Sequence, residues 1–66
     1  MLPQPGKVAL VVVRAWTEGP DPADFRARVT VVPDVDEPTE HVVMVGSAES
    51  AATLVRSWLL RFSGQG

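Results

Sequence analysis

The sequence contains no cysteine and no tyrosine, and it has a single histidine in 66 residues. Without cysteine the chain can form neither a disulfide framework nor a thiolate metal site, and His41 alone cannot complete a zinc site. The acidic loop before His41 lacks the glycine and the ligand spacing of a calcium-binding loop. We therefore expect no metal and no cofactor. Because catalytic bases are also scarce, we predict that the protein is not an enzyme.

Long apolar runs are missing as well. The apolar run at residues 8–13 ends at Arg14, whereas a membrane-spanning helix needs about 18 apolar residues or more. No small-residue cleavage site of a signal peptide follows this run. We therefore expect a cytoplasmic protein with no membrane partner.

The composition is that of a small folded domain. Hydrophobic residues make up 45% of the chain and charged residues 21%, and the net charge is −2, which gives no general attraction for nucleic acid. A chain this short buries little apolar surface, and such domains commonly rely on disulfides, a metal or a partner subunit. Because the chain has no cysteine and few metal ligands, a partner subunit is the remaining option, and we predict a homodimer.

Hydrophobic periodicity predicts the element order strand, strand, strand, helix. Residues 7–17 are rich in β-branched side chains, residues 24–32 alternate between apolar and polar, and residues 41–46 are a short apolar run. Two loops that carry prolines separate them, at residues 18–22 and 33–40. We divide the chain into a loose arm over residues 1–6, one domain over 7–63 and a C-terminal end over 64–66.

A helix is expected after the third strand. Ser47 is a plausible N-cap, and this simpler role is preferred over catalysis because the residues around it do not match a nucleophile elbow. Gly64 is a natural stop. The predicted apolar stripe comprises Ala48, Ala51, Ala52, Val55, Trp58, Leu59 and Phe62, widened by Leu54 and Leu60. In this interpretation Trp58 belongs to the core.

Together these elements predict an α+β fold, a three-stranded antiparallel meander with the helix packed on one face. The expected core on the second strand is Phe25, Ala27, Val29 and Val31. On the first strand, the small odd-numbered residues Ala9, Val11, Val13 and Ala15 are expected beneath the helix. For the third strand, the sequence leaves open whether His41, Val43 and Val45 or Val42 and Met44 face the core.

The other face of the sheet would then carry an exposed apolar patch. A monomer seldom leaves such a patch in water, so we predict a protein interface, either with a second copy or with a small protein partner. An incorrect register, or coverage by the N-terminal arm, is the alternative. The predicted interface residues are Val8, Leu10, Val12, Trp16 and Met44.

A basic cluster on the same face suggests a second function. Arg14, Arg26 and Arg28 lie near Trp16, and they could grip phosphate while the indole stacks on a base. A solvated face neutralised by Glu18 and Asp24 is the simpler interpretation. Nucleic-acid binding is therefore the weaker alternative, and no small-molecule ligand is indicated.

The sequence resembles two groups of bacterial proteins. The runs RAWTE at residues 14–18 and RARV at 26–29, ahead of an amphipathic helix, look like small strand-strand-strand-helix proteins that carry no assigned activity. Separately, PDV at residues 33–35 and SAESA at 47–51 resemble the Pro-Asp-Leu step and the helix start of the N-terminal domain of HicB-type antitoxins. The glycine pair, the Pro-Gly-Cys and the DNA-binding segment of that family are missing from this sequence. The second resemblance implies capping of a small toxin ribonuclease through protein contact.

Overall fold

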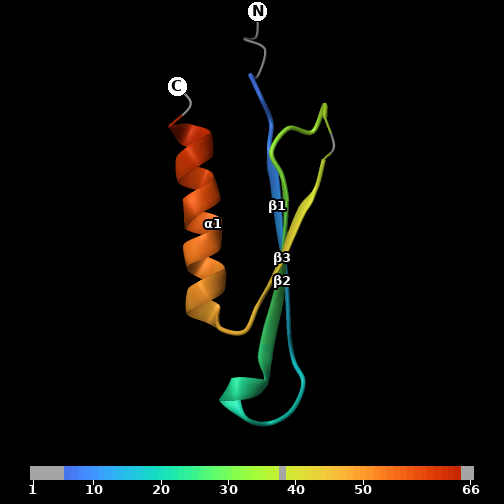
Figure 1. The fold of residues 1–66 in the computed structure, drawn as a ribbon, viewed down its shortest axis with the longest axis vertical. Coiled ribbons are helices and arrows are strands. Elements are labelled where there is room, and N and C mark those ends of the chain that lie inside the picture. Colours follow the sequence, from blue (N-terminus) through green and yellow to red (C-terminus); the bar gives the residue numbers. More distant parts are fainter. Residues whose placement is uncertain (1–5, 38, 65–66) are drawn as a thin grey trace, which may run out of the picture.

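The computed structural model describes residues 6–37 and 39–64, so most of the expected arm and the last two residues lie outside the described part. Figure 1 shows strand β1 (Leu10–Thr17), the short 3-10 turn η1 (Pro22–Asp24), β2 (Phe25–Val32), β3 (His41–Val45) and helix α1 (Ala48–Ser63). The strands form one antiparallel sheet in the order β1-β2-β3, and α1 lies on one side of it. The predicted α+β fold is confirmed.

The turn from β1 to β2 is held by its own aspartates. The Asp21 carboxylate accepts from the Ala23 N–H at 2.9 Å, and the Asp24 carboxylate accepts from the Asp21 N–H at 3.1 Å. These reciprocal bonds satisfy backbone donors that the short turn leaves free, and Pro22 starts the turn with a suitable φ. The proline-rich segment after Glu18 therefore reverses the chain as predicted.

The first strand begins later than predicted. The carbonyl of Val8 accepts from the N–H of Val35 at 2.9 Å, so this part of the chain pairs with the β2–β3 loop and not with β2. The ladder with β2 starts only at Leu10, opposite Val32. Val8 therefore lies just before β1 and not within it.

The strand register places every odd-numbered residue of the sheet on the helix side. Val29 lies between Val13 of β1 and Val43 of β3, and side chains directly opposite one another share a face. This register decides the question that the sequence left open. His41, Val43 and Val45 face α1, whereas Val42 and Met44 lie on the open face of the sheet.

The core is centred on the middle strand. Ala27, Val29 and Val31 of β2 are buried, together with Ala51 of α1. The predicted Phe25 is half-buried at the edge of this cluster. The other side chains packed against the core are Val11, Val45, Leu54, Val55 and Trp58.

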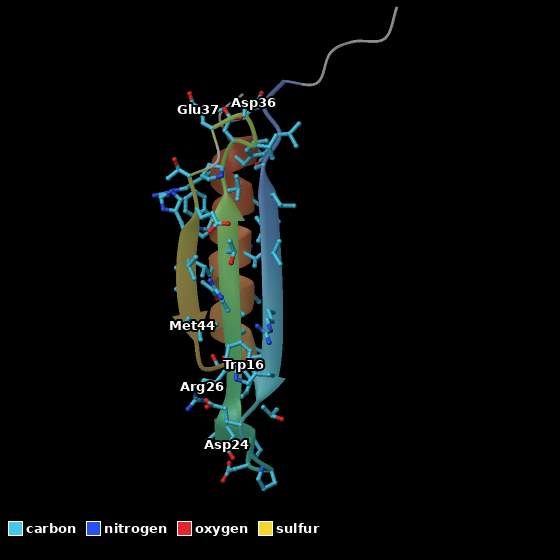
Figure 2. All side chains as sticks on the ribbon, turned by 90° about the vertical axis from the view of Figure 1, so that its right-hand side faces the viewer. Trp16, Asp24, Arg26, Asp36, Glu37 and Met44 are labelled. Carbon is cyan, nitrogen blue, oxygen red and sulfur yellow. The ribbon has the colours of Figure 1, made fainter. Side chains whose placement is uncertain are left out.

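The helix covers less of the sheet than predicted. It starts at the Ser47 cap, whose hydroxyl accepts from the Ser50 N–H at 3.0 Å, and it ends at Gly64. Figure 2 shows α1 behind β2, with β1 and β3 on either side. A helix about 10 Å wide cannot fully cover three strands spaced about 4.8 Å apart. The residues expected beneath or along it that are nevertheless exposed are Val13, Ala15, Ala48, Ala52, Leu59, Leu60 and Phe62.

Candidate interaction surface on the open sheet face

The face of the sheet opposite the helix has an apolar half at the start of β1. Leu10 lies opposite Val32, and Val12 shares a row with Thr30 and Val42. Leu10, Val12 and Val42 are 50%, 48% and 44% exposed, and Val8, two residues before the strand begins, is 45% exposed. We call Val8, Leu10, Val12, Val32 and Val42 the apolar half.

The remaining predicted interface residues belong to the other half of this face. Met44 lies opposite Arg28, and Trp16 lies opposite Arg26 (Figure 2). Met44 is the most exposed of the large hydrophobic side chains in the described ranges, whereas Trp16 is half-buried. The predicted set therefore spans both halves, and it does not form one apolar row.

Two apolar residues of this face were missed by the sequence prediction. Val32 continues the even-numbered side of β2, and this alternation could have identified it. Val42 could not be assigned, because all five residues of β3 are compatible with either face. Only its pairing with Thr30 places Val42 beside Val12.

Arg26 is occupied within the chain. Its Nε lies 3.0 Å from the Glu18 carboxylate, and its Nη1 donates to the carbonyls of Ala23 and Phe25. The expected neutralisation by Glu18 is therefore present, and Arg26 acts as a tie between β2 and the turn η1. The neighbouring Glu18 carboxylate offsets its charge and so weakens its attraction for an external anion.

Arg14 and Arg28 have a different environment. They lie directly opposite each other on β1 and β2. In the described ranges neither guanidinium comes within 4.0 Å of a carboxylate, and the Arg14 guanidinium lies 5.8 Å from the centroid of the Trp16 ring. The predicted basic cluster is thus reduced to Arg14, whose guanidinium lies near the Trp16 indole, and Arg28 opposite Arg14.

The other candidate residues have structural roles. His41 stacks against Trp58 with 5.4 Å between ring centroids, which ties β3 to the helix. In the acidic loop, the Asp34 carboxylate accepts from the Asp36 N–H at 3.0 Å. Across residues 6–37 and 39–64, no three histidine or acidic side chains gather as metal ligands would, and no helix is long and apolar enough to cross a membrane.

Comparison with protein-family models, curated proteins and solved structures finds no match for this chain. The resemblance to HicB-type antitoxins therefore stays a prediction. Among the exposed surfaces described above, the apolar half departs most from an ordinary solvated sheet face.

Proposed function

We propose that this chain is a non-enzymatic interaction protein that forms a homodimer through the apolar half of its open sheet face. The observation that carries the proposal is the half-exposure of Leu10, Val12 and Val42 on a sheet face that α1 leaves uncovered. Burying such side chains in a partner removes apolar surface from water, the main source of free energy in protein association.

The size of the core supports association. Four side chains in the described ranges are buried. A core of this size supplies little free energy of folding on its own, and small domains of this kind commonly add a partner subunit.

The charge distribution selects one arrangement of the two copies. Full overlap of the two open faces would bury the charged Arg14 and Arg28 of each copy against the sheet of the other copy. A two-fold axis through the apolar half avoids this contact, because the two apolar halves then stack and the arginines point to opposite ends. Sheets packed in this way lie about 10 Å apart, with the side chains of both inner faces filling the space.

A matched pair of leucine substitutions tests the proposal. Leu10→Arg places a charge in the apolar half, whereas Leu59→Arg makes the same change at a similarly exposed position on the helix side. We expect the Leu10→Arg variant to have the mass of a monomer by light scattering with an unchanged circular dichroism spectrum. The Leu59→Arg variant should remain a dimer. A folded Leu10→Arg variant that keeps the dimer mass would contradict the proposal.

The alternative occupant of the apolar half is a different small protein in place of a second copy. Capping of a toxin, which the HicB resemblance implies, is one such case. This alternative predicts a monomer that forms a one-to-one complex with its partner. The same Leu10→Arg variant, titrated with that partner, should fail to form the complex. This distinguishes partner docking from self-association because the isolated wild-type chain is then monomeric.

A second candidate function is favoured by the unneutralised pair Arg14 and Arg28. The two guanidinium groups could bind a phosphate, and the Trp16 indole near Arg14 could stack on one base of a single-stranded nucleic acid. Phosphate contacts weaken steeply as salt rises. Binding of a single-stranded oligonucleotide that falls with salt and disappears in an Arg14→Gln, Arg28→Gln double variant would support this function, and unchanged affinity in the double variant would reject it.

A further inference from the structure

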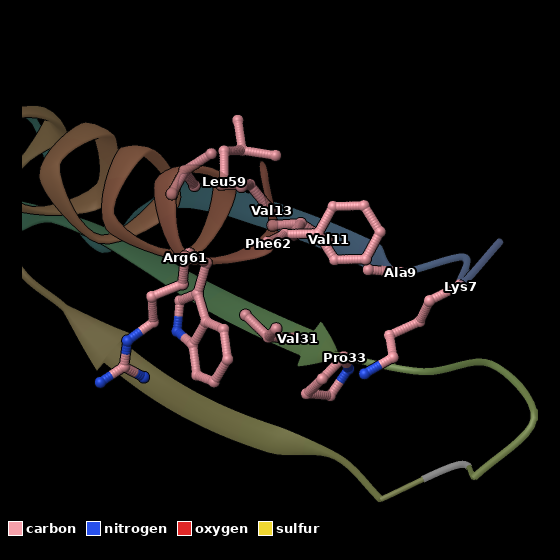
Figure 3. Close-up of a pocket in the computed structure, with 11 residues that line it drawn as sticks. Lys7, Ala9, Val11, Val13, Val31, Pro33, Leu59, Arg61 and Phe62 are labelled. Atoms are coloured by element: carbon pink, nitrogen blue, oxygen red, sulfur yellow. The ribbon is translucent and has the colours of Figure 1, made fainter. Parts of the chain in front are cut away.

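A second uncovered surface lies on the helix side of the sheet, between α1 and β1. It is a groove of about 740 Å³ that runs beneath the last turns of the helix (Figure 3). Val11 and Val13 line it from the strand, and Leu59 and Phe62 line it from the helix. A smaller hollow of about 480 Å³ continues it toward the start of the helix and shares Val13, Val55 and Leu59 with it. We call the two hollows together the trough.

The trough is apolar and open to solvent. Val13 is 47% exposed and Leu59 is 54% exposed, although both are large hydrophobic side chains on the inner side of their elements. This exposure follows from the position of α1 behind β2, which leaves the inner side of β1 without a cover. The trough and the apolar half therefore lie on opposite faces of the same strand.

The backbone of β1 borders the trough along its free edge. β1 is an outer strand of the sheet, it is eight residues long, and it contains no proline and a single charged residue, Arg14. Natural edge strands are usually short, charged or interrupted, because a long apolar edge is a template for another strand. A strand added beside β1 would place every second side chain over the trough.

The charged residues that line the trough are all cationic. They are Lys7, Arg56 and Arg61, and no carboxylate of the described residues lines either hollow. The Arg61 guanidinium lies 5.3 Å from the centroid of the Trp58 ring, which itself packs against His41 of β3. Lys7 and Arg56 are therefore the cations on the β1 side of the trough. The occupant that complements this lining has apolar side chains together with acidic groups.

We propose that the trough binds an extended acidic segment of a partner protein, which adds to β1 as a fourth strand. Main-chain hydrogen bonds to the edge of β1 would supply affinity, and alternate apolar side chains in the trough would supply specificity. Acidic residues on the same side of the segment meet Lys7 and Arg56.

A second copy of this chain fits the trough less well. A second copy offers two edge strands, β1 and β3. Residues 7–17 carry Lys7 and Arg14 and no acidic residue, so pairing β1 with β1 would bring like charges together beside a cationic lining. The residues of β3, His41–Val45, include no carboxylate that could meet this lining. The site is also independent of the dimer proposed above, since that dimer uses the opposite face of the sheet.

Peptides of defined chemistry test the proposal on the full chain. The probe is a fluorescein-labelled peptide of eight residues, to match the length of β1, with the sequence Glu-Thr-Val-Thr-Val-Thr-Glu-Thr. Its glutamates and valines occupy alternate positions, so in an added strand they share the side that faces the trough. We expect it to bind at least about tenfold more tightly than the same peptide with lysine in place of glutamate, as measured by fluorescence anisotropy at low salt. Equal binding of the two peptides, or no binding of the glutamate peptide, overturns the proposal.

Two N-methylated versions of the probe test strand addition. In an added strand, alternate N–H groups face β1, so methylation of one alternate set blocks the ladder and methylation of the other set leaves it intact. We expect one version to lose binding and the other to retain it. Equal binding of both versions shows that no strand is added and overturns the proposal.

A matched pair of serine substitutions locates the site. Leu59→Ser removes apolar surface from the trough, and Leu10→Ser makes the same change on the opposite face. We expect Leu59→Ser to weaken binding of the glutamate peptide by about fivefold or more and Leu10→Ser to leave it unchanged. The reverse result overturns the proposal.

Other occupants of the trough give distinct results. If a second copy fills the trough, the Leu59→Ser variant has a lower solution mass than the wild type, and added peptide dissociates the wild-type assembly. If a single-chain lipid fills the trough, dodecanoate binds and none of the peptides binds. Either result overturns the proposal. Neither result depends on whether the apolar half forms a dimer, because the mass of the Leu10→Ser variant tests that interface on its own.

Discussion

Arg14 lies directly opposite Arg28 across the β1–β2 ladder, and in the described part of the chain neither guanidinium meets a carboxylate. Like charges in this position repel each other, and the cost in folding free energy is of the order of a few tenths of a kcal/mol up to about 1 kcal/mol. The sheet tolerates this pair at its basic end, whereas the neighbouring Arg26 is neutralised by Glu18.

The arginine pair predicts a charge-reversal cycle. Arg14→Glu and Arg28→Glu should each raise the free energy of unfolding by about 0.5–1 kcal/mol, because each converts a repulsive cross-strand pair into an attractive one. The double variant should lose that gain, since it restores two like charges. Urea denaturation at low salt measures all three, and a double variant as stable as the single variants would show that the two side chains do not interact.

Removal of core volume from the middle strand should be costly. Val29 is fully buried, so Val29→Ala deletes two buried methylene equivalents and leaves a cavity. We expect the free energy of unfolding to fall by about 2 kcal/mol. The same change at the exposed Val43 of β3 should cost less than about 1 kcal/mol. Equal losses at the two positions, measured by urea denaturation, would contradict the placement of the core.

The helix cap gives a third prediction. The Ser47 hydroxyl accepts from the Ser50 N–H, so Ser47→Ala should lower the free energy of unfolding by about 1 kcal/mol. Ser57 lies exposed in the middle of α1, where alanine is the better helix former. Ser57→Ala should therefore leave the protein as stable as the wild type or slightly more so. Thermal unfolding followed by circular dichroism measures both, and a Ser47→Ala variant with wild-type stability would contradict a capping role.

The sequence predicted the elements well because their signals are local. The strict alternation from Phe25 to Val31 identified both the middle strand and its inner face, and Ser47 marked the start of the helix. The β1–β2 turn was visible in its prolines and aspartates. Each of these signals depends on neighbours in the chain, and each appears in the structure where it was expected.

The relations between elements could not be predicted in the same way. The five residues of β3 suit either face, so only pairing with β2 places Val42 on the open face. The late start of β1 follows from the bond between Val8 and Val35, which joins two segments far apart in the chain. The incomplete cover of β1 depends on where α1 lies over the sheet. Periodicity places Val13 and Leu59 on the inner faces of their elements, but it does not show that a single helix leaves both side chains exposed.

The central claim is that the apolar half of the open sheet face is buried against a second copy of the chain. The most direct test is the solution mass of the wild-type protein, measured by light scattering on a sizing column at low and at high salt. Apolar burial predicts a mass of twice 7.1 kDa that does not change with salt. A monomer at both salt concentrations would contradict the claim, and a dimer that dissociates at high salt would show that charged groups hold it together instead.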